Sequence, residues 1–318
     1  MAFTMHSHSG QFCPGHAVDQ LEDIINHAIS IGYKTIGLTE HMPRYHERDL
    51  YPEEMDDPQE SLRTLIPLHD AYLVEAQRLQ RAYASQIHIL IGFEAEFIRP
   101  EYYPLVKALA EPAIVDYFIG SVHHVHSIPI DYNKTFFAEA IAAAGGSEEQ
   151  LYADYYDLQH EMLAALKPRV VGHFDLIRLM SEEPDRDVRK QWKGVWAKIM
   201  RNLELAAKQG AWLECNTAAL RKGLAEPYPG RQIAEEWLKL GGKFTMSDDS
   251  HGIGQVATNY AHGLAYLESL GVNELWTLER KPNPGVKDGL RAMLVDKAVT
   301  VAEMRERFPI TTNGNASK

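Results

Sequence analysis

A regular alternation of short apolar runs with longer amphipathic segments is the feature of this sequence that most restricts its fold. Apolar runs of about four to eight residues predict buried strands, whereas apolar residues at every third or fourth position predict helices. The predicted strands are Ala2–Met5, Thr35–Leu38, Ile87–Phe93, Ile114–Ile119, Arg169–Val171, Ala211–Leu213, Phe244–Met246 and, more weakly, Leu275–Leu278. The predicted helices are residues 18–28, Gln59–Ala84, Glu148–Leu166, Val188–Gln209, Arg231–Leu240, Tyr260–Leu270 and Gly289–Val295. Because strands that are joined through helices run parallel, the alternation indicates an α/β fold with a parallel sheet.

Seven or eight strands in this arrangement favour a closed or distorted barrel over an open sheet. The 318 residues suit one such barrel, since α/β barrels commonly take about 250 residues plus insertions. No internal repeat and no Pro/Gly/Ser-rich linker divides the sequence, so we expect a single domain. Asp49–Pro58, which is acidic and ends at a proline, and Ser181–Asp187 are predicted to be long loops.

Composition and charge argue against several classes of protein. Hydrophobic residues make up 45% of the chain and charged residues 24%, which is typical of a globular protein with a large core. The net charge of −12 argues against a nucleic-acid partner, and no apolar run approaches the length of a membrane span or resembles a signal peptide. Two cysteines, Cys13 and Cys215, cannot build a disulfide framework and indicate a cytoplasmic location. We therefore expect no nucleic-acid or membrane partner, while the oligomeric state is not indicated.

Histidine and carboxylate residues recur at the ends of the predicted strands. The first strand is followed by His6 and His8, but this H-x-H triplet means little alone, since 15 histidines in 318 residues give about 0.7 such triplets by chance. The strand ends nevertheless supply a larger set: His6, His8, His16, His41, Glu94, His123, His173, Asp249 and His251. Because the carboxyl ends of barrel strands form the face that holds the active site, we expect these side chains to converge.

The types and the spacing of these residues suit metal ions. Imidazole nitrogens and carboxylate oxygens bind zinc, iron and manganese, and one carboxylate can bridge two ions. Side chains two positions apart in a strand point to the same side, so His6 and His8 can bind together. Asp249 and His251 have the same spacing. An isolated histidine such as His16, by contrast, is more often a surface or capping residue than a ligand.

Several neighbours of these candidates are expected to support the site rather than to bind metal. Glu96 and His124 each follow a better-placed candidate within two positions. Asp248 is expected to orient a ligand histidine through its free N–H group, as carboxylates behind metal ligands commonly do. Cys13 and Cys215 are interpreted as buried small residues rather than thiolate ligands.

The order of these motifs resembles the PHP (polymerase and histidinol phosphatase) family. The family pattern is H-x-H, E/D-H, G-x-E, G-S-x-H, G-H and D-x-H, and all six occur in that order between residues 6 and 251. The stretches HSHSGQFCPGHA, GFEAEF, GSVHHV, VGHFDLIR, LECNTAALRKG and MSDDSH resemble the histidinol-phosphatase branch of that family. The resemblance implies a distorted (β/α)7 barrel of the PHP type over residues 1–308, followed by a short polar tail at 309–318.

The resemblance further implies a site of three metal ions, which are zinc, iron or manganese. The implied ligands are His6, His8, His16, His41, Glu94, His123, His173, Asp249 and His251. Glu94 is the implied bridge, and we expect Glu94, Asp249 and His251 to be catalytic. The implied reaction is metal-dependent hydrolysis of L-histidinol phosphate to L-histidinol and phosphate in histidine biosynthesis, with this small phosphomonoester as the partner.

Residues that bind the substrate are less constrained by the motifs. Arg178 and Arg221 are predicted to bind the phosphate, because a guanidinium fork matches two phosphate oxygens. A solvated arginine at the start of a helix is an equally good interpretation of each. In the loop after the second strand, Tyr45, His46 and Tyr51 either contact the imidazole of the substrate or face solvent.

Other functions fit the same ligand set. A PHP phosphoesterase acting on phosphotyrosine, a nucleotide or another small metabolite would need the same metal ligands, because these bind the phosphate and not the leaving group. A non-enzymatic metal protein would have closed coordination with no space for water or phosphate. A metal-dependent amidohydrolase would need a carboxylated lysine, which has no clear counterpart here. Release of phosphate from histidinol phosphate distinguishes these functions.

Overall fold

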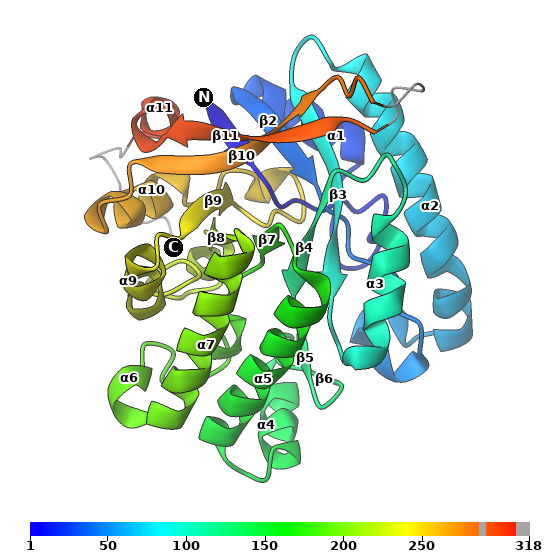
Figure 1. The fold of residues 1–318 in the computed structure, drawn as a ribbon. Helices are drawn as coiled ribbons and strands as arrows, with labels where there is room; N and C mark the ends of the chain where they lie inside the picture. Colours follow the sequence, from blue (N-terminus) through cyan, green and yellow to red (C-terminus); the bar gives the residue numbers. More distant parts are fainter. Residues whose placement is uncertain (286–290, 310–318) are drawn as a thin grey trace.

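Seven parallel strands form the central sheet of the computed structural model, which describes residues 1–285 and 291–309 (Figure 1). In the order of the sheet, the strands are β1 (Ala2–Thr4), β2 (Tyr33–Leu38), β3 (His88–Glu96), β4 (Tyr117–Ser121), β7 (Val170–Val171), β8 (Trp212–Asn216) and β9 (Lys243–Ser247). Backbone hydrogen bonds also join the two edges, because the Met5 N–H donates to Met246 O at 3.0 Å and the His8 N–H donates to Ser250 O at 2.8 Å. The sheet therefore closes nearly completely into a barrel.

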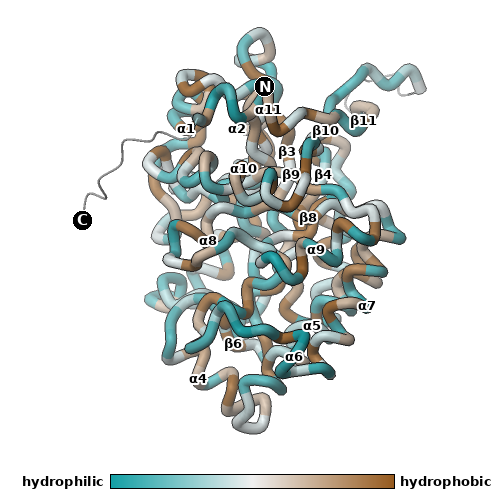
Figure 2. The backbone as a smooth tube through the Cα atoms, turned by 90° about the vertical axis from the view of Figure 1, so that its left-hand side faces the viewer, coloured by the Kyte–Doolittle hydropathy of each residue, from teal (hydrophilic) through white to brown (hydrophobic). Residues whose placement is uncertain are grey.

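Helices surround this barrel and pack their apolar sides against it (Figure 1). They are α1 (Leu21–Ser30), α2 (Pro58–Ala82), α3 (Tyr103–Ala110), α4 (Lys134–Ala143), α5 (Glu148–Leu166), α6 (Val188–Gln191), α7 (Lys193–Gln209), α8 (Ala218–Arg221), α9 (Arg231–Lys239), α10 (Tyr260–Ser269) and α11 (Val301–Arg307). Short 3-10 helices lie at Glu47–Asp49, Pro52–Glu54, Pro100–Tyr102, Leu176–Arg178 and Ile253–Gln255. Figure 2 shows hydrophobic segments along central strands such as β8 and β9, and hydrophilic stretches on the outer loops.

Burial on both faces explains why the barrel strands appear in the sequence as continuous apolar runs. In β3, every residue after His88 is buried, including the two glutamates Glu94 and Glu96. A strand of a one-sided sheet would instead alternate apolar and polar residues. The two buried carboxylates interrupt the apolar run only at its carboxyl end. This is the end of a barrel strand that carries functional residues.

Tyr117, the first residue of β4, contacts the chain directly after β1, although β2 and β3 separate these strands in the sheet. Its hydroxyl donates a hydrogen bond to the backbone oxygen of Met5 at 2.5 Å. A Cβ atom on Gly37 in β2 would lie 2.0 Å from this hydroxyl oxygen, so only glycine leaves room for the tyrosine. The close approach fixes the position of the chain one residue before His6.

A separate antiparallel hairpin covers the amino-terminal end of the barrel. It consists of β10 (Glu274–Lys281) and β11 (Met293–Thr300), which Figure 1 shows lying across the strands. Arg280 forms an ion pair with Asp116, which directly precedes β4. Asp296 forms ion pairs with Arg169, which precedes β7, and with Lys243 at the start of β9. The hairpin thus contacts the strands where they begin and leaves their carboxyl ends open.

The predicted barrel strands are confirmed, and the errors lie in the surrounding elements. The weak strand Leu275–Leu278 exists, but it belongs to the hairpin and not to the parallel barrel. The predicted helix Gly289–Val295 is wrong, because Met293–Val295 begin β11, whose residues bond across to β10; residues 289 and 290 lie outside the described residues. The predicted helix Val188–Gln209 is divided at Trp192 into α6 and α7.

Three further features of the chain bear on the predictions. Helices α3 and α4 and the small hairpin of β5 (His124–Val125) and β6 (Ile128–Pro129) were not predicted. Of the polar tail at 309–318, all but the first residue lies outside the described part of the chain. In the described ranges, no helix combines the length and the apolar character that crossing a bilayer requires.

Candidate metal centre

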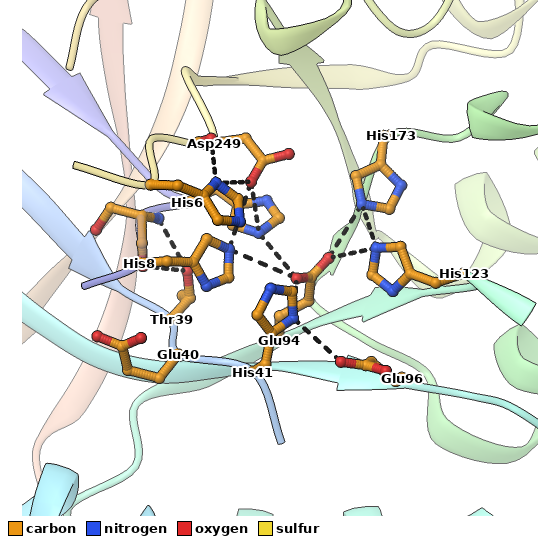
Figure 3. A network of polar contacts seen from close by, with 12 residues as sticks. His6, His8, Thr39, Glu40, His41, Glu94, Glu96, His123, His173 and Asp249 are labelled. Atoms are coloured by element: carbon orange, nitrogen blue, oxygen red, sulfur yellow. Dashed lines mark hydrogen bonds and ion pairs between the residues drawn. The ribbon is translucent and has the colours of Figure 1, made fainter. Parts of the chain in front are cut away.

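The carboxyl ends of six barrel strands bring eight of the nine predicted ligands together. Figure 3 shows the Glu94 side chain in the middle, with His6, His8 and Asp249 on one side and His123 and His173 on the other. The ligand atoms form three groups, each with all atoms within 4.8 Å of one another. The groups are His8, His41 and His251; His6, His8 and Asp249; and Glu94, His123 and His173. His8 belongs to two of the groups, and Glu94 of the third contacts His6 and His41 of the other two, so the three candidate sites form one continuous centre.

Glu94 has the geometry of a bridging carboxylate. Its Oε2 atom lies 3.3 Å from His6 Nε2 and 3.1 Å from His41 Nδ1. Its Oε1 atom faces the other way and lies 3.0 Å from His173 Nε2 and 3.4 Å from His123 Nε2. The two oxygens of one carboxylate thus serve two different sets of imidazoles, as a bridge between two metal ions requires.

The residues fit metal ions because their polar atoms are buried and lack other partners. His6, His8 and Glu94 are each at most 1% exposed. His6 Nε2, both ring nitrogens of His8, and Asp249 Oδ1 have no hydrogen-bond partner among the described residues. Leaving a buried polar atom unpaired costs about 1–3 kcal/mol, so a cluster of them is stable only when something else binds them. A nitrogen-rich donor set with carboxylates suits zinc, iron or manganese.

Mutual charges decide which groups of the cluster carry protons. Burial lowers the pKa of His6, but nearby carboxylates, foremost Asp249 and Glu94, outweigh it and raise that pKa well above the ordinary value. Burial raises the pKa values of Glu94 and Asp249, but histidines, foremost His6, hold both well below the ordinary range. Burial and the neighbouring His41 lower the pKa of His8 to about 3. The ionised carboxylates of Glu94 and Asp249 and the neutral imidazole of His8 are the forms that bind metal. The raised pKa of His6 shows that the surrounding charges favour a cation at its position.

Glu214, at the centre of β8, organises the ligands from behind. Its Oε2 atom lies 3.0 Å from His6 Nδ1, and its Oε1 atom accepts the backbone N–H of His173 at 2.6 Å. Side chains of Asn216 and Ser247 donate to the same carboxylate, each at 2.9 Å. Glu214 therefore orients one ligand through its ring and another through its backbone. The signal for Glu214 in the sequence is its position directly after the predicted strand Ala211–Leu213.

One predicted supporting role is wrong. Asp248 does not hold a ligand histidine; its carboxylate accepts from the Tyr33 hydroxyl at 2.8 Å and from the Ala257 N–H at 2.7 Å. The side chain that contacts the free ring nitrogen of a ligand on this side is Glu214. The partners of Asp248 thus lie at the start of β2 and in the loop after β9, away from the ligand groups.

Glu96 does contact a ligand, as expected of a supporting residue. Its Oε1 atom lies 3.1 Å from His41 Nδ1 and 3.2 Å from Arg44 Nη1. Burial raises the pKa of Glu96, but the charge of Arg44 outweighs this and keeps the carboxyl ionised. His124 lies against the Tyr51 ring, with ring centroids 5.4 Å apart, and contacts no candidate ligand of the three groups through a hydrogen bond.

The cluster opens into a cavity of about 250 Å³. Besides candidate ligands, its wall consists of Tyr51, Asp131, Tyr132, Leu176 and Lys222. Small-molecule sites commonly have about 300–1,000 Å³, so the space suits a small substrate. Open space beside the ligands disfavours the closed coordination of a purely structural metal site. Of the three loop residues expected near the substrate, Tyr51 lines this cavity and Tyr45 and His46 do not.

His16 lines the same cavity but is not in any of the three groups. Its Nδ1 atom lies 2.7 Å from Glu53 Oε1, and its ring lies beside those of His41 and His251, with centroids 5.1 and 4.9 Å apart. His16 lies near the candidate metal centre because the chain reverses its direction between Ser9 and Val18. Its role as a ligand stays a prediction.

Neither predicted phosphate-binding arginine lines the metal cavity. Arg178 is buried; it donates to Asp175 Oδ2 and to the backbone oxygens of Glu226 and Pro227, all at 2.9 Å. Arg221 donates to the backbone oxygens of Asp248 and Asp249, both at 2.9 Å. The residue after Arg221, Lys222, does line the cavity. Sequence reasoning missed Lys222 because a lysine one position beyond a short helix carries no distinctive signal.

Comparisons with known proteins agree with the geometry. Residues 4–218 match the model of the family described as PHP domain. A Schizosaccharomyces pombe protein named "Probable histidinol-phosphatase" is 42% identical over 315 residues, which is 99% of each chain. The histidinol-phosphatase of Saccharomyces cerevisiae is 31% identical over 309 residues, covering 88% of this chain and 92% of its relative.

A solved structure shows the same fold. It is the histidinol phosphate phosphatase of Lactococcus lactis, complexed with zinc, L-histidinol and phosphate. It superposes with a TM-score of 0.65 at 18% sequence identity, covering 92% of this chain and 98% of that chain. With the family model, the full-length relatives and the converging ligand set in agreement, this chain belongs to the PHP-domain family and, within it, to the histidinol-phosphatases.

Proposed function

We infer that this chain hydrolyses L-histidinol phosphate to L-histidinol and phosphate, with metal ions as cofactors. The observation that carries the inference is the set of three contiguous ligand groups opening into a small cavity, in a chain similar over nearly its whole length to a histidinol-phosphatase. The reaction belongs to histidine biosynthesis. A cytoplasmic location is proposed with it, since both cysteines are unpaired.

We propose that the three groups hold three metal ions, with zinc the first to test because the Lactococcus lactis protein binds it. Bound ions would neutralise charge on the phosphoryl oxygens and lower the pKa of water toward about 7. Glu94 would hold two ions at a fixed separation, while Asp249 and His251 would complete the wall beside the phosphate. These three are the proposed catalytic residues.

The phosphate needs positive charge beyond the metal ions. Lys222 is the cationic side chain in the cavity wall, and it has no ion pair with a described residue. Arg221 fixes the backbone of Asp248 and Asp249, and its proposed contact with phosphate is supported by its place one residue before Lys222. A phosphate contact for Arg178 would require this side chain to leave Asp175 or the backbone oxygens that it now binds. Iron or manganese, and other phosphomonoesters as substrates, remain the alternatives of the same proposal.

The hydrolysis can be tested directly on the purified protein. Metal-loaded protein should release phosphate from L-histidinol phosphate far faster than from phosphotyrosine or a nucleoside monophosphate, and a chelator should abolish the release. Faster release from either competing ester would overturn the substrate, and full activity after complete removal of metal would overturn the mechanism.

A pair of histidine variants tests the assigned centre. His6→Ala removes a fully buried ligand and should lower kcat/KM by more than the roughly 10–100-fold that is typical for a residue behind a ligand. His160→Ala changes a histidine on α5 outside the three groups and should leave kcat/KM unchanged. Equal losses in the two variants would contradict the assignment.

A further inference from the structure

Two charged side chains in the wall of the metal cavity remain without a role in metal binding. They are Asp131 and Lys222, which have opposite charges. Asp131 is not in any of the three ligand groups. In the described ranges, neither side chain makes a hydrogen bond or an ion pair. A carboxylate without a partner in a cavity wall favours a cation beside it.

The fold fixes the position of Asp131 from both sides. The β5–β6 hairpin has a two-residue loop, His126 and Ser127, with φ values of 55° and 61°. Positive φ at both positions is the conformation of a tight type I′ turn, and it reverses the chain within two residues. The N–H of Ile130 then donates to the backbone oxygen of His123 at 2.9 Å. Asp131 therefore follows directly after a residue that is bonded to a metal-ligand candidate.

The segment after Asp131 is fixed as well. Asn133 caps helix α4, because its side-chain oxygen accepts the N–H of Phe136 at 2.9 Å. The turn itself is held from outside, where His126 Nε2 lies 2.8 Å from Asp154 and Arg99 donates to the Ser127 hydroxyl at 3.3 Å. A carboxylate on a segment held in this way is preorganised and does not need to move to bind a ligand.

The chemistry of the inferred substrate supplies a matching cation. In L-histidinol phosphate, the carbon next to the ester CH2 group carries an ammonium group, so this charge lies close to the phosphate. When the phosphate is at the metal centre and Lys222, the ammonium must lie against another part of the same cavity wall. Asp131 is the carboxylate of that wall that is outside the metal groups. A hydrogen bond between charged groups is roughly twice as strong as a neutral one.

We propose that Asp131 binds the ammonium group of the substrate and makes the enzyme selective for phosphomonoesters that carry an amine beside the ester. This inference rests on the proposed hydrolysis of L-histidinol phosphate. The metal centre and Lys222 then bind the phosphate, which all phosphomonoesters share. Asp131 recognises the amino alcohol, which differs between substrates.

The test compares L-histidinol phosphate with its deamino analogue, 3-(imidazol-4-yl)propyl phosphate, on metal-loaded enzyme. The native enzyme should prefer the amine-bearing ester by about 10- to 100-fold in kcat/KM, the value of one hydrogen bond to a charged group. In Asp131→Asn this preference should fall to less than about 3-fold, chiefly through loss on the amine-bearing ester. Asp131→Glu, which retains the charge, should keep most of the preference.

The matched control is Lys222→Met, which should slow hydrolysis of both esters by similar factors and so leave the preference unchanged. Binding of the product L-histidinol, measured by calorimetry, should weaken in Asp131→Asn and not in Lys222→Met. An unchanged preference in Asp131→Asn, or an equal loss on both esters, would overturn the role of Asp131. Failure of the native enzyme to hydrolyse either ester would instead overturn the proposed function.

Discussion

At the scale of single residues, the centre depends on a carboxylate that belongs to none of the three ligand groups. Glu214 is fully buried and contacts the ring of His6 and the backbone of His173. Burial raises its pKa, but His6 outweighs this and keeps the carboxyl ionised. Glu214 therefore determines which ring nitrogen of His6 faces the metal site, because the nitrogen next to the carboxylate carries the hydrogen.

Replacing Glu214 with glutamine should weaken metal binding while the fold persists. The amide retains the size of the side chain but can present its N–H2 group to His6, which disturbs the orientation of that ring. We expect about a 10–100-fold loss of zinc affinity, measured by competition with a chromophoric chelator. Glu204→Gln, at an exposed position of α7, is the control and should bind zinc as the native protein does. Equal affinities in both variants would show that Glu214 does not orient the ligands.

The convergence of the candidate ligands could be predicted because they combine two signals, residue type and position at a strand end. His6, Glu94 and Asp249 all satisfy both. Asp131 has a suitable residue type but follows no predicted strand, and Lys222 has neither signal; each lies in a loop whose path depends on tertiary contacts. The error at Asp248 has a different cause, because its partners, the Tyr33 hydroxyl and the Ala257 N–H, come from segments far away in the sequence.

At the scale of elements, the barrel strands were predictable because burial on both faces makes each a continuous apolar run. The β5–β6 hairpin has strands of only two residues, which is too short for any periodicity. Helix α4 was not predicted because apolar or small residues occupy most of its positions, exposed as well as buried. The segment therefore lacks the alternation of apolar and polar sides that identifies a surface helix. The first three residues of β11 were predicted as part of a helix, and the rest of the strand was not predicted, because β11 is largely exposed and its pattern is not that of a buried strand.

Helix α2 contains a histidine that should make stability depend on pH. His69 is buried, its two ring nitrogens have no hydrogen-bond partner in the described chain, and its ring lies 5.9 Å from those of Tyr72 and Phe93. Burial lowers its pKa to about 4, although Asp70 opposes the shift. In the unfolded chain the ordinary pKa is about 6.5, so between pH 6.5 and 4 only the unfolded chain takes up this proton. The folded state therefore loses up to about 3 kcal/mol from this group as the pH falls through that range.

His69→Leu should remove this part of the pH dependence. Relative to the native protein, the free energy of unfolding of the variant should improve by about 3 kcal/mol between pH 7 and pH 4. Urea unfolding of both proteins, in the presence of chelator, measures the difference. Leu79→Val, at a buried position of the same helix, should shift the free energy by a constant amount at all pH values. Parallel curves for His69→Leu and the native protein would rule out the burial of a neutral imidazole.

At the scale of the whole molecule, the barrel divides stability and chemistry between its two ends. Apolar strands and the β10–β11 hairpin stabilise the amino end, whereas the carboxyl end gathers buried ionisable groups, several of whose polar atoms have no hydrogen-bond partner among the described residues. Strands from β1 at residue 2 to β9 at residue 247 supply these groups. Because the ligands come from strands far apart in sequence, the centre exists only in the folded chain, and metal binding is coupled to folding.

Zinc should therefore stabilise the entire protein. At a free concentration 100 times the dissociation constant, one bound ion adds about 2.7 kcal/mol to the free energy of unfolding. Thermal unfolding of chelator-treated protein should occur at a lower Tm than that of the zinc-loaded protein. In His6→Ala the gain from zinc should be smaller, whereas in His160→Ala it should be unchanged. Equal Tm values with and without zinc would mean that the ions do not bind the folded chain preferentially.

The hairpin over the amino end also has a practical consequence. Strand β11 exposes Met293 and Ala298, and ion pairs attach the hairpin to the beginning of the barrel strands, whereas the candidate ligands follow their carboxyl ends. A linker attached at Ala298 would tether the enzyme to a solid support and leave the metal cavity open to the solution. Immobilisation through this strand should thus preserve turnover, since the tether and the substrate would never compete for the same end of the barrel.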